Sequence, residues 1–203
     1  SLLEVPPIKL GAVPAHHIKL IDTQLAKLRN ALFVARALGR ALVLPPTLCS
    51  CELGFWPNHV AERCTANDHK MLVLPYTCAL DHYLDPRALD ASPYAHREAS
   101  FFDNPHTPTA ALRRATVAVR TGDGPASAGV AHLPPRPSAA ELRRRLGALP
   151  NARVLHFEDI DTAFGSFDTA GDAARWHADA ASLLSDWCCT SDERFKRRAG
   201  IVP

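Results

Sequence analysis

One stretch near the start of the chain repeats hydrophobic residues at three- and four-residue intervals. Asp22 or Thr23 can cap a helix at its start, and Gly39 suits its end because glycine readily adopts a left-handed conformation. The apolar stripe between them consists of Leu25, Leu28, Ala31, Leu32, Val34, Ala35 and Leu38. The pattern therefore predicts an amphipathic helix over residues 22–39 whose leucines face the core.

A run of apolar residues follows this helix directly. Residues 40–45 read Arg-Ala-Leu-Val-Leu-Pro, and Pro46 reinforces the stop. Such a run is typical of a strand that is covered on both faces, as strands in parallel sheets are. A helix, a tight turn and a buried strand form half of a right-handed βαβ unit.

Short strands and helices alternate along the rest of the chain. Strands are predicted at residues 16–21, 71–74, 115–120 and 153–157. Helices are predicted at 138–149, where Ser138 provides the cap, and at 170–188, with helical turns within 78–89. The connections include a cysteine-bearing loop over 47–70, a polar loop over 94–108 and a flexible Gly- and Ser-rich stretch over 121–129. This alternation predicts an α/β fold with a mostly parallel, Rossmann-like sheet flanked by helices.

Length and charge limit the choices further. No internal repeat or clear boundary divides the 203 residues, so a single α/β domain over 1–203 is expected. The chain begins at Ser1 in mid-pattern and its only methionine is Met71, which suggests a fragment of a longer protein. No membrane segment is expected within it, because no apolar stretch reaches the ~20 residues that a membrane helix needs. A net charge of +2 gives no reason to expect a nucleic-acid partner.

Six cysteines are the most unusual feature of the composition. They are Cys49, Cys51, Cys64, Cys78, Cys188 and Cys189. An even number favours disulfides in an oxidising compartment. A zinc site involving His82 is an alternative, but zinc sites usually show two closely spaced ligand pairs and here there is one. Buried free thiols are a third possibility.

Several segments, taken in order, resemble one enzyme group. Residues 24–32 (QLAKLRNAL) and 35–45 (ARALGRALVLP) resemble the helix and R-x-L-V-L-P block of plant and algal glycosyltransferases. Protein O-fucosyltransferase-like enzymes share a looser version of this block. The further blocks are Cys49, Leu74-Pro75 before Cys78, Asp81-His82, Arg97-Glu98-x-Ser100-Phe101, Asp103-Asn104-Pro105, Phe157-Glu158-Asp159, the Phe-Gly-x-Phe of 164–167, and Trp187-Cys188-Cys189. Over residues 16–189 the chain is similar to the extensin arabinosyltransferase group of plant nucleotide-diphospho-sugar transferases.

This resemblance implies a membrane-anchored Golgi enzyme that acts in the lumen of the secretory pathway. It would transfer a sugar, with arabinose favoured, from a nucleotide-sugar donor to a cell-wall or secreted glycoprotein. Such transferases carry a metal-binding Asp-x-Asp, and Asp159-Ile160-Asp161 has that spelling but lies in the wrong part of the pattern. The chain resembles the region that follows the nucleotide-sugar domain. No metal ligand or cofactor is therefore expected within it, although the full-length protein could use a divalent metal such as Mn.

The chemistry of this reaction suggests roles for the polar residues. A transferase must neutralise a diphosphate leaving group, and an inverting enzyme needs a carboxylate or imidazole as base for the acceptor hydroxyl. The candidate catalytic residues are Asp81, His82, Glu98 and Asp103. The candidate substrate-binding residues are Arg29, Asn30, Arg97, Asn104 and Glu158.

Each group also has a structural explanation that the sequence leaves open. Arg29 can be a solvated arginine, Asp81 a helix cap, and Glu158 a cap for the next helix. The loop from Arg97 to Asn104 can simply hold itself together. A rival function is therefore a non-catalytic, disulfide-stabilised module that holds a glycan or polypeptide for a separate catalytic domain. A third possibility is a zinc-stabilised intracellular domain.

Overall fold

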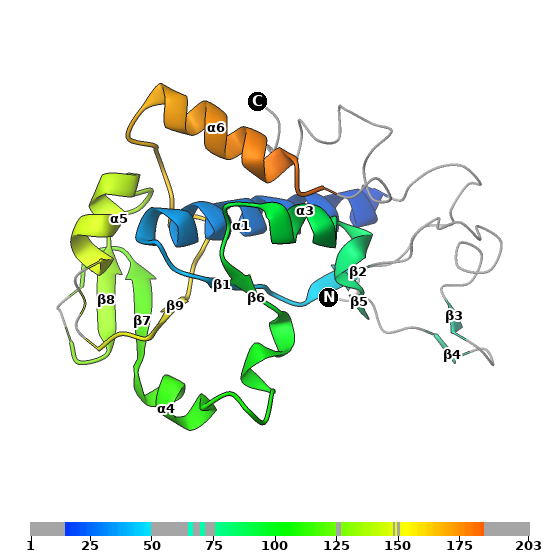
Figure 1. The fold of residues 1–203 in the computed structure, drawn as a ribbon, viewed down its shortest axis with the longest axis horizontal. Helices are drawn as coiled ribbons and strands as arrows, with labels where there is room; N and C mark the ends of the chain where they lie inside the picture. The colour runs from blue at the N-terminus through cyan, green and yellow to red at the C-terminus, as the bar shows by residue number, and fades with distance from the viewer. Residues whose placement is uncertain are drawn as a thin grey trace.

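The computed structural model describes residues 15–49, 65–66, 70–71, 76–124, 127–147, 149 and 151–184. Its helices are α1 (Ala15–Leu38), α3 (Pro86–Ala91), α4 (Thr109–Arg114), α5 (Ala139–Leu146) and α6 (Ala170–Ala181), with the 3-10 helices η1 (Leu80–His82) and η2 (Ala99–Phe102). Its strands are β1 (Leu42–Val43), β2 (Thr47–Cys49), β3 (Thr65–Ala66), β4 (Lys70–Met71), β5 (Tyr76–Cys78), β6 (His96–Arg97), β7 (Thr116–Thr121), β8 (Val130–Leu133) and β9 (Val154–Phe157). Figure 1 shows their arrangement.

A parallel sheet flanked by helices confirms the predicted α/β class. β7 is the centre of a three-stranded sheet in the order β8-β7-β9, and both pairings are parallel. β1 pairs with β6, also in parallel. Two short antiparallel pairs, β2 with β5 and β3 with β4, lie in the cysteine-bearing part of the chain. In Figure 1 the long helix α1 runs between the sheet side and α6, and it packs against α5 and α6.

The first helix is longer than the sequence pattern predicts. It begins at Ala15, so the strand predicted at residues 16–21 and the helix start at residue 22 are wrong. Thr23 does not cap the helix, because its hydroxyl donates to the carbonyl of Lys19 one turn earlier. The predicted end is confirmed, since Gly39 has a φ of 62° and the amides of Gly39 and Arg40 donate back into the last turn.

Other elements follow the prediction at their centres more closely than at their ends. β7 and β9 lie within one residue of the predicted segments, and α5 begins one residue after its predicted start. The hydroxyl of Ser138 accepts from the amide of Glu141, which confirms the predicted cap of α5. The predicted strand over 40–45 is reduced to β1, whose residues are only half-buried. The loops predicted over 47–70 and 94–108 contain β2, β3 and β6, while α4 and β8 were not predicted.

Some predicted segments fall partly outside the described residues. β4 ends at Met71, and residues 72–75 are not described. α6 ends at Ala181, and the predicted continuation to 188 passes beyond residue 184. The helix predicted over 138–149 ends at Leu146.

Two hydrophobic clusters form the core, and α1 contributes to both. The first contains Leu25 of α1, Cys49, Tyr83, Tyr94 and Leu183 among its buried members. The second contains Phe33 of α1 together with buried residues of β7, β8, α5 and α6, among them Val119, Leu133, Leu142, Leu146 and Trp176. The leucine-rich helix is therefore core structure, as the sequence predicted.

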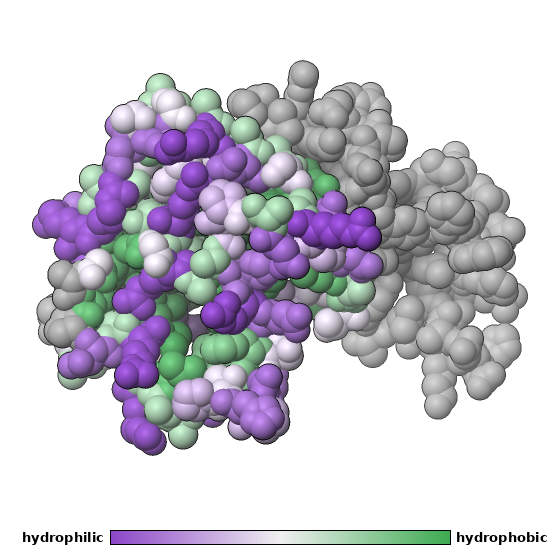
Figure 2. Space-filling view, in the orientation of Figure 1, coloured by the Kyte–Doolittle hydropathy of each residue, from purple (hydrophilic) through white to green (hydrophobic). Residues whose placement is uncertain are grey.

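One face of the described part is seen in the space-filling view. Figure 2 shows hydrophilic residues over most of the visible face, with hydrophobic residues seen chiefly in a hollow between the parallel sheet and the η2–α4 segment. None of the described helices combines the length and the apolar character that crossing a bilayer requires.

Candidate functional site

The carboxyl ends of β7 and β9 meet at a point where the chain changes direction across the sheet. The chain leaves β7 toward β8 on one side, and after α5 it returns to β9 on the other side of β7. Ligands of open α/β sheets bind outside the carboxyl ends of the strands at such a point. The segment that follows β9, residues 158–162, lies here, and we call it the post-β9 segment.

Polar contacts link the post-β9 segment to the end of β7. Glu158 accepts from Nε of Arg120 at 2.9 Å, and both side chains are about half exposed. The hydroxyl of Thr162 donates to Asp159 at 2.6 Å and lies 3.0 Å from the hydroxyl of Thr121. This hydroxyl and the amide of Asp161 hold the pKa of Asp159 below its usual value, so its carboxylate stays charged.

α1 reaches the same segment from the opposite side. Asn30 donates from Nδ2 to the carbonyls of Ile160 at 3.3 Å and Asp161 at 3.2 Å. Its Oδ1 accepts from the guanidinium of Arg29 at 3.2 Å. Lys27, near the helix surface, lies 3.5 Å from the carboxylate of Asp161. Of the predicted substrate-binding residues, Glu158 thus lies in this segment, Asn30 contacts it, and Arg29 contacts Asn30.

The guanidinium of Arg29 is half-buried beside α6. Burial lowers the pKa of Arg29, although an arginine remains charged at any physiological pH. His177 of α6 lies close enough for Arg29 to lower the pKa of its imidazole, after the larger effect of burial. The ring of His177 packs edge-on against Phe33, with centroids 5.2 Å apart. The charged guanidinium of Arg29 therefore lies near His177, whose ring is packed against Phe33.

Four of the other predicted residues lie on a separate exposed segment that runs from β6 to just after η2. Arg97, Glu98, Asp103 and Asn104 are all exposed. Asn104 accepts from the amide of His106, and Arg97 donates to the carbonyl of His96, so both make local contacts. Within the described part of the chain, no hydrogen bond or ion pair joins these four side chains to one another. The structure places them on one short exposed stretch of the chain, without polar contacts among their side chains.

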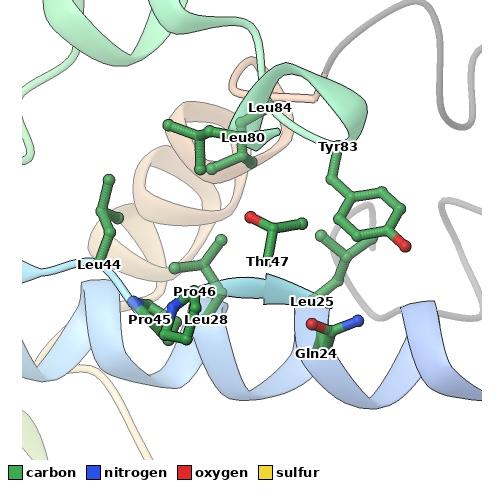
Figure 3. Close-up of a pocket in the computed structure, with 10 residues that line it drawn as sticks. All are labelled: Gln24, Leu25, Leu28, Leu44, Pro45, Pro46, Thr47, Leu80, Tyr83 and Leu84. Carbon is green, nitrogen blue, oxygen red and sulfur yellow. The ribbon is translucent and has the colours of Figure 1, made fainter. Parts of the chain in front are cut away.

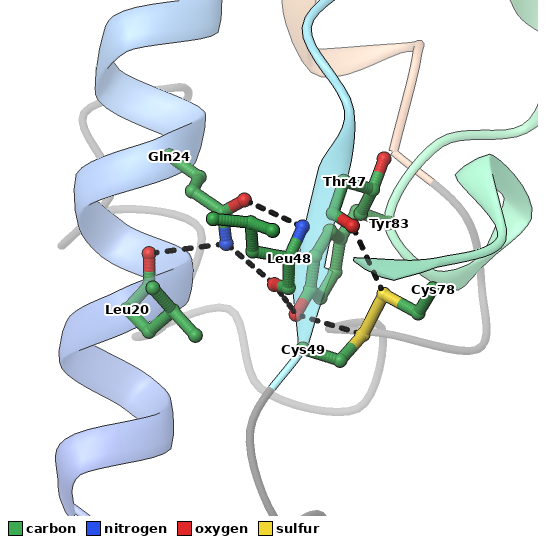
Figure 4. Close-up of a disulfide and its surroundings, with 7 residues drawn as sticks. All are labelled: Leu20, Gln24, Thr47, Leu48, Cys49, Cys78 and Tyr83. Carbon is green, nitrogen blue, oxygen red and sulfur yellow. Dashed lines mark hydrogen bonds between the residues drawn. A yellow bond between two sulfur atoms is a disulfide. The ribbon is translucent and has the colours of Figure 1, made fainter. Parts of the chain in front are cut away.

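Asp81 and His82 lie on η1, next to the described disulfide. Asp81 is exposed, and the side chain of His82 lies outside the described residues. Cys49 and Cys78 form a disulfide between β2 and β5, with Cα atoms 5.8 Å apart, which confirms part of the cysteine prediction. Figure 4 shows the Tyr83 hydroxyl beside it, 2.9 Å from the carbonyl of Leu48 and 3.4 Å from Sγ of Cys49. The remaining cysteines lie outside the described residues.

The carboxylate of Asp159 forms part of a turn after β9. Both oxygens of Asp159 receive hydrogen bonds, one from the amide of Asp161 and one from the hydroxyl of Thr162. Among the described residues, no group of three or more His, Cys, Asp or Glu side chains is placed to hold a metal ion.

A small hollow lies away from the post-β9 segment. Figure 3 shows it between α1, the Pro45-Pro46 turn and η1, with Leu28, Leu44 and Leu80 among its mostly apolar lining. Its volume of about 30 Å³ is far below the ~300 Å³ or more of typical small-molecule sites. We regard it as a packing defect beside the disulfide and not as a site for a sugar nucleotide.

Some residues around the post-β9 segment were not found from the sequence. Thr121 and Thr162 come after predicted strands, and this position in the sequence could have identified them as candidate site residues. Lys27 and His177 lie on helices, and their proximity to the segment depends on how α1 and α6 pack. No local pattern encodes that packing.

Comparison with known proteins reveals one distant similarity. The chain is 23% identical over 194 residues to "Arabinosyltransferase XEG113" of Arabidopsis thaliana. The aligned region covers 87% of this chain and 29% of that protein, so the chain spans less than a third of its relative. No known family model matches the chain. No solved structure matches it either. The chain is thus glycosyltransferase-like in sequence, in agreement with the resemblance drawn from its motifs.

Proposed function

We propose that the protein containing this chain transfers a sugar, with arabinose favoured, from a nucleotide-sugar to a cell-wall or secreted glycoprotein. The observation that carries the proposal is the similarity to an arabinosyltransferase along 87% of the chain. The fold supports it, because the polar groups of α1, β7 and the post-β9 segment gather at the edge where α/β sheets bind ligands.

In this proposal the edge of the sheet binds the diphosphate of the donor. Breaking the glycosidic bond leaves negative charge on the departing diphosphate, and fixed cations stabilise that charge. Arg120 and Lys27 contact carboxylates of the post-β9 segment directly, and Arg29 is linked to the segment through Asn30. Arg120 is shared with Glu158, and a bound diphosphate would compete with that carboxylate.

The acceptor hydroxyl requires a base. Glu98 and Asp103 are exposed carboxylates on the segment after β6, and Asp81 is exposed on η1. An exposed carboxylate can approach a glycoprotein acceptor, which must bind from solvent. We therefore assign the acceptor side of the reaction to Glu98 and Asp103, with Arg97 and Asn104 as binding residues beside them.

A non-catalytic binding module is the second candidate. The observation that favours it is that the chain spans 29% of its relative, so a catalytic centre can lie in the remainder of the protein. The lack of contacts among the side chains of Arg97, Glu98 and Asp103 fits a flat binding surface as well as an active site.

The location proposed is the lumen of the Golgi, with the full-length protein held by a membrane anchor. The Cys49–Cys78 disulfide supports a secretory compartment, because disulfides persist in oxidising surroundings and are rare in the cytosol.

The test is an assay of the purified full-length protein with nucleotide-arabinose and other pentose or deoxyhexose donors. We expect release of the nucleotide and transfer to a glycoprotein acceptor. If Glu98 or Asp103 is the base, the variant that removes that residue, Glu98→Gln or Asp103→Asn, should lower kcat by roughly 10²-fold or more. Normal activity in both variants would favour the binding module for this chain, and no turnover with any donor would reject the transferase.

A further inference from the structure

Asn30 is the one polar side chain in the buried core of the described residues, with 9% of its surface exposed. A buried amide without hydrogen bonds destabilises a protein, so such groups are retained where all their partners are present. Asn30 has them, because its two amide protons and its oxygen are all used. Its burial is therefore explained by contacts within the protein.

The contacts also determine the orientation of the amide. Two carbonyl oxygens face one end, which must be the NH2 group, and a guanidinium faces the other, which must be the oxygen. Nδ2 has no proton left for a ligand. A direct contact with substrate, the role that the sequence suggested for Asn30, would require breaking this arrangement.

We propose that Asn30 is a positioning residue, which holds Arg29 and the post-β9 segment in one fixed arrangement at the edge of the sheet. This inference rests on the proposed transferase function, because it assigns Arg29 to the donor diphosphate. Asn30 joins positions that are 130 and 131 residues apart in the chain. Displacement of reacting groups by about 1 Å can slow an enzyme by ~10²-fold.

Gln24 provides a matched control on the same helix. Its Nε2 donates to the carbonyl of Leu48 at 2.7 Å, and its Oε1 accepts from the amide of Leu48 at 2.8 Å. Figure 4 shows this side chain reaching from α1 to β2, beside the disulfide. Gln24 thus does for β2 what Asn30 does for the post-β9 segment, away from the proposed donor site.

The experiment compares Asn30→Asp with Gln24→Glu in the full-length protein. Each variant replaces a carboxamide by a carboxylate of the same shape and removes N–H donors from backbone carbonyls. Asn30→Asp keeps an acceptor for Arg29 and loses the link to Ile160 and Asp161. We expect kcat, corrected for the folded fraction, to fall by at least about tenfold in Asn30→Asp with a smaller change in donor KM. Gln24→Glu should leave both within about twofold.

The split between kcat and KM separates positioning from a purely structural role. A structural role would lower the folded fraction in both variants and leave the corrected kcat unchanged. Hydrogen exchange adds a readout that does not depend on turnover: Asn30→Asp should speed exchange in residues 158–162, and Gln24→Glu should speed it in β2. Asn30→Ser, which introduces no charge, replaces Asn30→Asp if the latter does not fold.

The outcomes distinguish this inference from the proposed function. An active wild type with equal corrected kcat values in both variants would overturn the positioning role and leave the transferase standing. A wild type that turns over no donor would reject the transferase, and the positioning role with it. Unchanged exchange in residues 158–162 of Asn30→Asp would also overturn the inference.

Discussion

Two regions of this molecule are hydrogen-bonded to the same helix, α1. One of them contains the Cys49–Cys78 disulfide, and the other, the post-β9 segment, contains no disulfide. Near the middle of α1, Gln24 hydrogen-bonds β2, which a disulfide joins to β5. Further along, Asn30 hydrogen-bonds the post-β9 segment, which the described contacts hold by hydrogen bonds and ion pairs. The first region surrounds an apolar hollow, and the second gathers charged and hydroxyl groups.

This difference indicates that the two regions bound by α1, the disulfide region and the post-β9 segment, have different roles. Covalent bonding and apolar packing suit a region whose task is to keep its shape. Polar contacts can be exchanged for contacts with a ligand, which suits a region that binds one. The predictions below test whether the two regions are independent, beginning with the largest effect on stability.

Removing the disulfide should have the largest effect. Cys49→Ala/Cys78→Ala opens a link between residues separated by 29 positions, and a loop of this size corresponds to about 3.6 kcal/mol of unfolding free energy. Urea denaturation of the variant and the wild type measures the loss. The difference should vanish when both are measured in strong reductant. A change in donor KM as well would contradict the independence of the two regions.

Replacing Arg36 should weaken the junction between the two clusters. Its guanidinium lies over Tyr94 of the first cluster and Trp176 of the second, at 5.4 and 4.7 Å from the ring centroids, and pairs with Asp179 at 2.6 Å. Arg36→Met should lower the free energy of unfolding by about 3 kcal/mol, because it leaves Asp179 unpaired and removes both ring contacts.

The control for this prediction is an ion pair on the surface of α6. Arg175 pairs with Asp172 one turn away, and the Arg175 side chain is 62% exposed. Arg175→Met should change stability by about 0.5 kcal/mol or less. Equal losses of unfolding free energy in Arg36→Met and Arg175→Met would show that the contacts of Arg36 with the two clusters stabilise the protein no more than an exposed ion pair does.

The helices α1 and α5 and the strand β2 show which features of the fold could be predicted from the sequence. Local rules succeeded where they had a local cause, as in the Ser138 cap of α5 and the Gly39 end of α1. They failed at the start of α1, because the partly alternating residues 16–21 fit a strand as well as a helix. β2 could not be predicted, since it forms by pairing with β5 some 29 residues away.

The candidate site, like the fold, could be predicted only where a residue's role has a local cause in the sequence. Glu158 was identified because it follows a strand, a relation visible in the sequence. Arg29 and Asn30 were identified by resemblance, but the partners of Asn30 are carbonyls 130 residues away. Its hydrogen-bonding role therefore depends on the tertiary packing of α1 against the segment after β9.

A methyl group at Gly165, three residues after the post-β9 segment, should clash with the backbone before α5. A Cβ there would lie 2.0 Å from the carbonyl oxygen of Arg136, a backbone atom that cannot move aside freely. Gly165→Ala should therefore lower the free energy of unfolding by about 2 kcal/mol. Gly171→Ala is the matched control, because its nearest neighbour would be at 3.8 Å and the residue lies in α6. It should be neutral or stabilising by up to about 1 kcal/mol, and a loss equal to that of Gly165→Ala would contradict the steric explanation.

Acid should loosen the contact between α6 and α1 by a smaller amount. Burial, and then Arg29, lower the pKa of His177, so the folded protein favours the neutral imidazole. Above the pKa of an unfolded histidine, about 6.5, both states are neutral and the full stability is present. As the pH falls below that value, the unfolded chain binds a proton first, and stability is lost until the pH passes the lower folded pKa.

His177→Phe should remove this part of the pH dependence, since phenylalanine can pack against Phe33 and Phe167 without titrating. Urea denaturation from pH 7 downward, compared with the wild type, measures the change in slope. If His177→Phe and the wild type lose stability in parallel, the imidazole is not the group responsible. The next group to replace would then be Asp159, because the hydroxyl of Thr162 and the amide of Asp161 lower its pKa and these contacts lose stability as falling pH protonates the carboxylate.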